Sequence, residues 1–369
     1  MNLPMRLAPH SLTLAADAEA RVTFAVTPGD MAESGYLYVA LDMPDGLTRL
    51  DVTLDYAKAT DCLIDIGLFD PRATGFPCRE GFRGWSGGAR EALFVATDAA
   101  TPGYVAGPLM PGRWLVILGL VRLPEDGAEV TLTARGAATP RPPARPKPPN
   151  NPVRPGPLWA KGDCQCHTFH SDAKGAPEVL HAQARKAGLD FLFVTDHNTM
   201  TAWDAYFEGA SSPDLLFLRG IEVTTPPGHG NALGIDRWVD FRLEQPGDPD
   251  RLIEEVYAAG GLFSINHDKP DIPWTWPVPT IDAMEVWQRH WLMGNAIARE
   301  KYDARLARGR PIALIGGSDW HQPAEVSDDP FALGCPTTVL HCTELSQQGV
   351  MAALRAGHGY VTEGPEGPS

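Results

Sequence analysis

Apolar and polar residues alternate, or apolar residues form short runs, through most of residues 20–137. This period of two predicts β-strands, and the segments rich in Gly, Pro and Asp between the runs predict turns. The predicted strands cover residues 21–26, 36–43, 50–57, 62–70, 92–98, 113–121 and 128–136. Short strands at near-regular spacing favour a sandwich or jelly roll, so we expect an all-β domain over residues 1–140.

One segment of this half departs from the pattern. Residues 82–90, which read FRGWSGGAR, combine three glycines with Trp85 and two arginines. We interpret them as a loop that packs at a turn or between domains, with contact to a ligand as the alternative. The half contains no set of residues with the spacing of a catalytic site.

A proline-rich stretch then interrupts the strand pattern. Residues 139–159 read TPRPPARPKPPNNPVRPGPLW and contain too few apolar residues to build a core. Such sequences run extended as semi-rigid connectors, so we place a linker at residues 141–159. Beyond it, apolar runs alternate with helical patterns, which favours a parallel β/α architecture for a second domain over residues 160–369. The helical patterns cover residues 177–187, 251–261, 292–308 and 345–360.

Residue types that bind metals follow the apolar strands of this second domain. They are Asp196 and His197 after residues 191–194, Glu222 after 215–218, His267 after 262–265, Glu285 within 284–286, and Asp319 and His321 after 312–315. Parallel strands of a β/α barrel end at one mouth, so these side chains are expected to converge there. On the strand ahead of them all, Gln165 and His167 are two residues apart and therefore point to one face.

The candidates do not all have the same expected role. For Asp196 we favour orienting a neighbouring His or capping a turn, and we keep it among the candidate catalytic residues with Asp319 and His321. Glu222 and His229 lie in a Gly- and Pro-rich segment whose turns could bring both to one ion.

The ligand types also bear on the metal. A set of His and carboxylate ligands without a paired Cys motif suits Mn, Fe or Zn. Cys164 and Cys166 have no second pair elsewhere in the sequence, and we interpret them as small core residues.

Composition excludes several classes of protein. The 369 residues carry a formal net charge of −15, with no concentration of Lys and Arg suited to nucleic acid or an anionic membrane. No window approaches the ~18 consecutive apolar residues of a membrane span, and the first residues do not resemble a signal peptide. Six scattered cysteines fit a reduced, cytoplasmic protein. Nothing in the sequence predicts an oligomeric state.

The motifs GDxQxHTxxSD, TDHN, IE, NHxxP and SDWH occur in this order over residues 160 to about 364. This order resembles the polymerase and histidinol phosphatase (PHP) superfamily of metal-dependent phosphoesterases. The all-β leader and the PxGxxNALG segment resemble its carbaryl-hydrolase-like branch. The resemblance implies a distorted seven-stranded β/α barrel with two or three divalent metal ions in one mouth.

Carried over to this sequence, the resemblance implies three sets of metal ligands. One ion would be held by His167, Glu222 and Asp319, a second by Glu222, His229 and His267, and a third by Asp172, His197 and His321. The chain departs from the family at Gln165, where the first motif usually has a His. A neutral amide oxygen is a poorer ligand for these metals, so the first site would be weak, hydrated or empty, and a dinuclear centre is the alternative.

These residues predict metal-assisted hydrolysis of a small phosphate mono- or diester. Clustered divalent ions lower the pKa of water and neutralise charge on phosphoryl oxygens, which explains how an acidic protein could accept an anionic substrate. Gln165, Lys269, Arg289 and His290 are the candidates for substrate contacts. One alternative is a metallohydrolase of carbamate or carboxylic esters, and another is a ligand-binding protein without catalysis.

Overall fold

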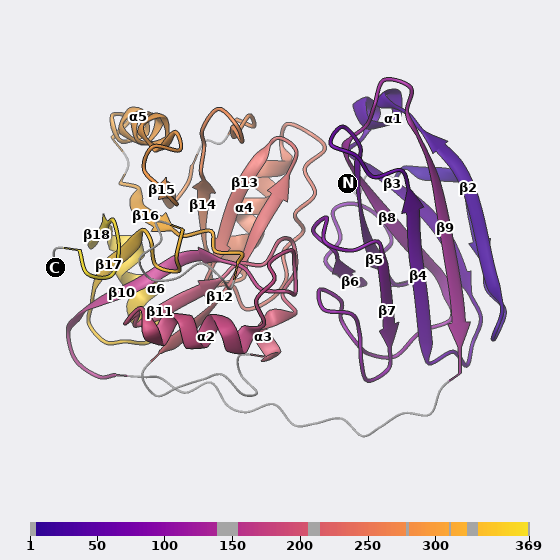
Figure 1. Ribbon diagram of the computed structural model, residues 1–369, viewed down its shortest axis with the longest axis horizontal. Coiled ribbons are helices and arrows are strands. Elements are labelled where there is room, and N and C mark those ends of the chain that lie inside the picture. The colour runs from indigo at the N-terminus through magenta and orange to yellow at the C-terminus, as the bar shows by residue number, and fades with distance from the viewer. Residues whose placement is uncertain are drawn as a thin grey trace. The chain divides into compact units, whose positions relative to one another are not determined.

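The computed structural model describes residues 5–138, 154–205, 215–277, 280–309, 311–322 and 331–367. It divides into two compact units, Met1–Pro146 and Lys147–Ser369 (Figure 1). In the described part of the first unit the elements are β1 (Leu7–Thr13), β2 (Glu19–Val26), α1 (Pro28–Glu33), β3 (Tyr36–Met43), β4 (Arg49–Tyr56), β5 (Leu63–Phe69), β6 (Phe82–Trp85), β7 (Ala92–Ala96), β8 (Gly112–Arg122) and β9 (Ala128–Ala137).

These strands form two sheets that share one apolar core. One sheet has the order β1-β3-β8-β5-β6 and the other β2-β9-β4-β7. Along β4 every second residue, Leu50, Val52 and Leu54, is buried, as the alternating sequence predicts. The core cluster includes these three side chains together with Val116 of β8 and Leu132 of β9. The period of two is therefore expressed as two sheets packed face to face.

The segment predicted as a loop over residues 82–90 begins with a strand, which corrects that prediction. All four residues of β6 are buried, and Trp85 lies over glycines of the neighbouring strands. A Cβ atom at Gly67 would lie 2.5 Å from the Trp85 ring, and one at Gly119 would lie 2.7 Å from it. Arg83 is buried too and donates to backbone carbonyls. Trp85 and Arg83 therefore pack inside the unit, which removes the basis for ligand contact.

The second unit is a mixed α/β structure. Its described elements are β10 (Leu158–Cys166), α2 (Pro177–Lys186), β11 (Phe191–Val194), α3 (Ala202–Ala205), β12 (Leu216–Thr225), β13 (Gly228–Leu233), α4 (Asp248–Ala258), β14 (Leu262–Asn266), β15 (Ala283–Gln288), α5 (Asn295–Leu306), β16 (Ala313–Gly317), β17 (Thr337–Cys342), α6 (Gln347–Ala356) and β18 (Gly359–Thr362). Figure 1 shows helices α2 and α5 outside the strands.

One sheet of nine strands, in the order β16-β15-β14-β13-β12-β11-β10-β17-β18, forms the centre of this unit. The pairs among β10, β11 and β12 and among β14, β15 and β16 are parallel, but β13, β17 and β18 pair antiparallel with their neighbours. The expectation of seven strands in a parallel barrel is therefore not met. Two residues, Pro226 and Pro227, separate β12 from β13, and so short a connection joins only antiparallel strands.

The first and last parallel strands of the sheet approach each other, so that the sheet is nearly closed. The backbone N–H of Asp319, just after β16, donates to Gln165 O on β10 at 2.9 Å. Cys166 and Trp320 form a parallel bridge beside this contact. The near closure brings the C-terminal ends of β10 and β16 side by side, where the sequence places several of the predicted ligands.

Glycines account for two helix boundaries that differ from the predicted ones. Helix α5 begins at Asn295 rather than 292, because Gly294 before it has a left-handed backbone with φ of 84°. Helix α6 ends at Ala356, where Gly357 adopts φ of 65° and β18 follows. By contrast, α2 begins at Pro177 and ends just before Gly188, as predicted.

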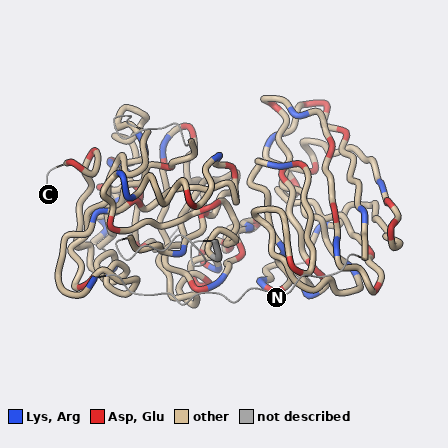
Figure 2. Tube along the Cα trace, turned by 60° about the horizontal axis from the view of Figure 1, so that its bottom comes forward, with Lys and Arg blue, Asp and Glu red and all other residues tan. Residues whose placement is uncertain are grey.

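The proline-rich linker falls largely outside the described residues, which resume at Arg154. Strand β10 begins at Leu158, before the predicted end of the linker at residue 159. In both units Lys and Arg are interspersed with Asp and Glu along the described chain (Figure 2). Among the helices described, none has the length and apolar character needed to cross a membrane.

Candidate metal centre

The C-terminal ends of the parallel strands bring histidines and carboxylates together in three overlapping groups. Within each group the potential ligand atoms all lie within 4.8 Å of one another. The groups are His167, Asp172, His197 and His321; Glu222, His229 and His267; and His167, Glu222 and Asp319. All eight residues predicted as metal ligands lie in this cluster, and Glu222 and His167 each belong to two groups.

Glu222 lies at the centre of the cluster and is fully buried. Its Oε2 atom is 3.2 Å from His167 Nε2 and 3.2 Å from His197 Nδ1. Its Oε1 atom is 3.1 Å from His229 Nδ1 and 3.5 Å from His267 Nε2. One carboxylate therefore faces four imidazoles, two through each oxygen.

The β12–β13 hairpin explains why Glu222 and His229 meet. In its register Thr224 pairs with His229 and Glu222 with Asn231, so Glu222 and His229 are diagonal neighbours on one face. On the other side of β13, His229 pairs with Asn266, which directly precedes His267. The antiparallel strand that the sequence analysis did not predict therefore positions His229 between Glu222 and His267.

Asp319 lies on the other side of the cluster, at the end of β16. Its Oδ1 atom is 3.0 Å from His167 Nε2 and 3.4 Å from Gln165 Nε2. Its Oδ2 atom accepts a hydrogen bond of 2.7 Å from Gln288, whose own carbonyl oxygen accepts from the Lys269 ammonium at 2.5 Å. The Lys269–Gln288 contact thus fixes the orientation of the Asp319 carboxylate.

Asp172 and two histidines form the most open part of the cluster. Asp172 Oδ1 is 3.1 Å from His321 Nε2 and 3.4 Å from His197 Nε2, and its side chain is 34% exposed. The His167 ring stacks against the rings of both His197 and His321, with centroid separations of 4.4 and 4.3 Å. Water or a substrate could therefore reach the cluster beside Asp172.

Backbone conformations at the cluster are unusual. His267, Arg289 and Asp319 have φ of 30°, 54° and 50°, and Asn198, next to His197, has φ of 57°. Residues other than Gly seldom adopt this left-handed region of backbone conformation. The conformation costs about 1–3 kcal/mol for each residue, and this cost is tolerated mainly at functional sites. All four residues follow strand ends, so this strained geometry turns the chain at the mouth of the sheet.

Ionisation of the cluster is strongly coupled. Burial is the largest influence on each group, yet the carboxylates raise the pKa of His167 well above its ordinary value. The histidines in turn hold the pKa values of Glu222 and Asp172 below the ordinary range, against the effect of burial. Burial lowers the pKa of His267 to about 4, which leaves its imidazole neutral and able to ligate a cation.

The residues present fit divalent metal ions. Buried His167 Nε2 and Glu222 Oε2 lie close together without forming a hydrogen bond to any partner in the described chain, which a shared cation would resolve. Three histidines are anchored through Nδ1: His197 contacts Thr224 at 2.5 Å, His267 contacts Glu285 at 2.8 Å, and His321 donates to Asp319 O at 2.7 Å. Nε2 of His267 and of His321 is thereby directed to a carboxylate of the cluster, whereas His197 presents Nδ1 to Glu222 and Nε2 to Asp172.

Three other candidate residues lie outside the three groups of potential ligands. Asp196 lies behind the cluster, where it accepts hydrogen bonds from the backbone and hydroxyls of Thr168 and Ser171 at 2.6–3.2 Å. It therefore organises the loop that carries Asp172, in keeping with the orienting or capping role favoured from the sequence. Lys269 is buried, and its ammonium donates to the side-chain oxygen of Gln288. His290 belongs to none of the three groups, and its Nδ1 accepts from the Leu292 N–H at 3.3 Å.

Arg289 and Gln165 both lie against Asp319. The Arg289 guanidinium donates to the Asp319 carbonyl at 2.6 Å and keeps 20% of its side chain exposed. Gln165 is fully buried, and its Oε1 atom has no hydrogen-bond partner among the described residues. Both therefore lie at the edge of the cluster, Arg289 on its partly exposed side and Gln165 on its buried side.

Two buried carboxylates support the site, and the sequence analysis did not assign them. Glu285 accepts from the His267 backbone N–H at 3.0 Å as well as contacting its ring. Burial raises the pKa of Glu285 well above its ordinary value, as does the charge of Asp319. The sequence does show Glu285 in an apolar strand next to the other candidate residues, and this position indicates that it lies near the site.

Asp163 is the second of these carboxylates and joins three segments. It accepts backbone hydrogen bonds from Gln165 and Ser318 at 3.0 Å and from Gly334 at 2.9 Å. Burial raises its pKa to about 6, although these hydrogen bonds favour the charged form. Asp163 thus ties the end of β10 to the end of β16.

An Asp163→Asn variant should be less stable by about 1–3 kcal/mol, because the amide group would leave one buried N–H without an acceptor. Thermal or urea unfolding of the metal-free protein measures this effect. Asp303→Asn is the matched control, since Asp303 is 54% exposed and pairs only with Arg299 across one helical turn. Equal stability of both variants and the wild type would contradict the role given to Asp163.

One family of known proteins matches the stretch that carries most of the cluster. Residues 163–267 match the PHP domain family, and this stretch includes six of the eight predicted ligands, all but Asp319 and His321. No curated protein matches the chain.

The solved structures similar to this chain include two bacterial proteins. A two-domain protein from Bacteroides vulgatus, described as containing a predicted PHP-like metal-dependent phosphoesterase, is 23% identical, with a TM-score of 0.48 over 60% of this chain and 70% of that one. A proposed metal-dependent phosphoesterase from Bifidobacterium adolescentis is 20% identical, with a TM-score of 0.38 over 56% of this chain and 98% of that one.

Proposed function

We propose that the protein is a metal-dependent hydrolase of small phosphate mono- or diesters and that the cluster holds two or three divalent ions. The observation that carries the proposal is the shared position of Glu222, whose two oxygens face ligands of different groups. Such ions, of Mn, Fe or Zn, would activate water and neutralise phosphoryl charge. The match of residues 163–267 to the PHP domain supports this assignment.

The chain's own residues would have distinct tasks in this reaction. Glu222 would hold two ions at a fixed separation, and Asp319 would be kept in place by Gln288. Arg289, which is partly exposed beside Asp319, would donate hydrogen bonds to non-bridging phosphoryl oxygens. His321 would remain a ligand with its proton on Nδ1, because that atom donates to the Asp319 carbonyl.

The experiment that tests this function measures metal content per chain beside hydrolysis of three aryl substrates: a phosphomonoester, a phosphodiester and a carbamate. We expect bound transition metal and turnover of one of the phosphoesters, with loss of turnover on chelation and recovery when metal is restored. Turnover of the carbamate alone would replace the proposed substrate class by carbamate esters. Protein that binds no metal and hydrolyses nothing would refute the proposal.

A Gln165→His variant should bind more metal than the wild type, by up to about one ion per chain, because imidazole is a better ligand than an amide oxygen. Gln165 Nε2 lies 3.4 Å from Asp319 Oδ1, so a ring at this position would face the His167 group. Elemental analysis of both proteins gives the answer, with Gln348→His on the exposed side of α6 as control. Unchanged metal content would indicate that Gln165 contacts substrate instead.

A further inference from the structure

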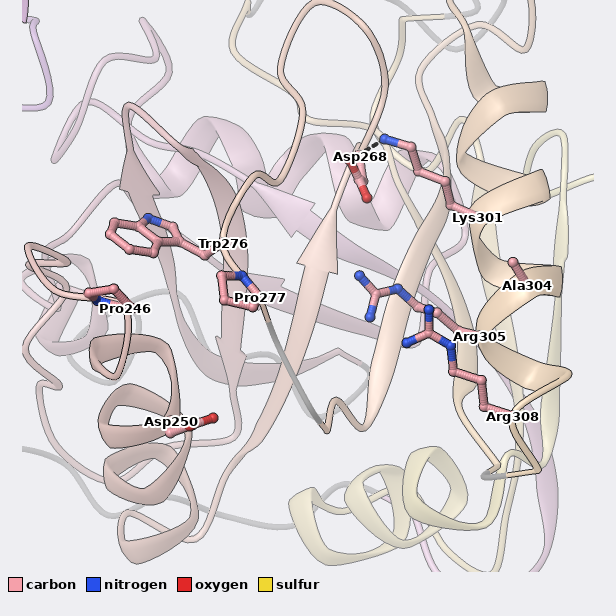
Figure 3. Close-up of a pocket in the computed structure, with 9 residues that line it drawn as sticks. All are labelled: Pro246, Asp250, Asp268, Trp276, Pro277, Lys301, Ala304, Arg305 and Arg308. Atoms are coloured by element: carbon pink, nitrogen blue, oxygen red, sulfur yellow. Dashed lines mark hydrogen bonds and ion pairs between the residues drawn. The ribbon is translucent and has the colours of Figure 1, made fainter.

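A cavity of about 590 Å³ lies between helices α4 and α5, and its lining includes none of the predicted metal ligands. Its lining residues are Pro246, Asp250, Asp268, Trp276, Pro277, Lys301, Ala304, Arg305 and Arg308 (Figure 3). The volume is that of a pocket for a small organic molecule rather than for a single ion. Nothing in the proposed hydrolysis uses this cavity.

One face of α5 and the residues just beyond it supply positive charge to the cavity. Lys301, Arg305 and Arg308 are spaced by four and three residues, so they project from one face of the helix. Figure 3 shows the two guanidinium groups next to each other and turned toward the cavity. The three cations therefore line one wall.

The three cations differ in whether they are paired. The Lys301 ammonium lies 2.6 Å from Asp268 Oδ1. Neither guanidinium forms an ion pair or hydrogen bond with any residue that the structure describes. Burial lowers the pKa of Arg305, and the charge of Arg308 lowers it further, while Asp268 acts in the opposite direction. Two adjacent cations of this kind repel each other unless an anion lies between them.

The helix dipole explains only part of this arrangement. Cations at the C-terminal end of a helix are favourable, and Arg305 lies in the last turn of α5. That effect accounts for the sign of the charges but not for their orientation into a cavity in a protein of net charge −15. An oxyanion that accepts hydrogen bonds from both guanidiniums accounts for the sign and the orientation together.

The opposite wall indicates what the rest of the ligand is like. Trp276, Pro246 and Pro277 line the cavity across from α5, and the Trp276 indole extends toward the side where Pro246 lies (Figure 3). Such surfaces favour a planar apolar group over further charge. Asp250, on the same side, would repel a second anionic group.

We propose that this cavity is a second binding site, for a small aromatic or heterocyclic molecule that carries one phosphate, phosphonate or carboxylate group. The oxyanion binds Arg305 and Arg308, and the ring lies against Trp276. The site is separate from the metal centre, so it stands independently of the proposed hydrolysis. An aryl phosphate and free phosphate both carry the oxyanion that the two arginines would bind. The test below distinguishes these two ligands.

The test is calorimetric titration of the metal-loaded full chain with phenylphosphonate, which is not hydrolysed, and separately with inorganic phosphate. We expect the wild type to bind phenylphosphonate both at the metals and in the cavity, and the Arg305→Ala/Arg308→Ala double variant to lose the cavity event. A Glu222→Gln variant should lose phenylphosphonate binding at the metals but keep binding in the cavity. Failure of the proposed hydrolase and failure of this cavity site therefore give different results. If the double variant does not fold, Arg308→Ala alone, at an exposed position, should weaken cavity binding by about tenfold.

Two further variants complete the test. Trp276→Ala should weaken phenylphosphonate binding while leaving inorganic phosphate unaffected, because only the former has a ring. Arg299→Ala is the matched control, since Arg299 lies on the same helix, is 61% exposed and pairs with Asp303. Undiminished binding in the Arg305→Ala/Arg308→Ala variant, an equal loss in Arg299→Ala, or cavity binding of inorganic phosphate but not phenylphosphonate would each overturn the proposal.

Discussion

A Glu222→Gln variant should bind less metal and lose hydrolytic activity by at least about a hundredfold. Gln preserves the shape of the side chain but replaces one oxygen with an amide nitrogen, which cannot ligate a cation. Both oxygens are needed, because each lies within 3.2 Å of at least one imidazole, His167 and His197 on one side and His229 on the other. Loss of outer partners of a metal site already costs about 10–100-fold, and Glu222 would be a direct ligand of two ions.

Stability gives a second measure of the same variant that does not depend on finding the substrate. Ligands that bind only the folded state raise the melting temperature, so the wild type should gain stability when metal is added. The Glu222→Gln protein should lose most of this gain, yet fold without metal, since burying a neutral amide costs less than burying a carboxylate. Glu254→Gln, an exposed position on α4, is the control and should respond to metal as the wild type does. Full metal content and full stabilisation of Glu222→Gln would contradict the shared-ligand role.

Asp319→Ala should abolish hydrolysis to a similar extent while the fold is retained. The backbone around Asp319 is held independently of its carboxylate, because its N–H donates to Gln165 O and its carbonyl accepts from Arg289. Removing the carboxylate therefore removes a metal ligand and the partner of Gln288 without releasing the loop. Activity and metal content of the purified variant measure the effect, and an active Asp319→Ala protein would refute the proposed centre.

Asp319→Asn separates the chemistry of this residue from its backbone strain. Asp319 has φ of 50°, a conformation that Asn tolerates better than Ala, whose cost is about 1–2 kcal/mol. We therefore expect Asn to lose activity like Ala but to keep a higher unfolding temperature in the absence of metal. Equal unfolding temperatures would mean that the left-handed conformation contributes no measurable strain.

Residues outside the three groups of potential ligands hold those ligands in position. Asp196 fixes the loop that carries Asp172, and Glu285 fixes the ring of His267. Asp163 joins the ends of β10 and β16 through three backbone hydrogen bonds. Substitutions at these positions would alter ligand orientation rather than ligand number, and they would be mistaken for ligand losses if only activity were measured.

Much of the organisation could be predicted from sequence because it depends on local patterns. The period of two predicts strands such as β4, where burial alternates with the pleat. Apolar runs predict strands such as β3, which is buried at every position except Asp42. Helix α2 has its proline at the first turn and a glycine just after its end, and these signals act within a few residues. Candidate ligands such as His197, His267 and Asp319 could be named for the same reason, since each occurs where an apolar run gives way to polar chain. Asp172 was named only through the resemblance to the PHP superfamily.

The geometry of the site required the tertiary structure, because strand pairing joins residues that are distant in sequence. Whether β13 runs parallel or antiparallel decides if His229 reaches Glu222, and the near closure of the sheet decides if Asp319 reaches His167. Register and sheet closure depend on packing of whole faces, which no local period encodes. Thus the sequence by itself determined which residue types are available to bind metal. The fold determined which of them lie within one group and which support that group from outside. It also placed Arg305 and Arg308, at the end of α5 and just beyond it, beside a separate cavity.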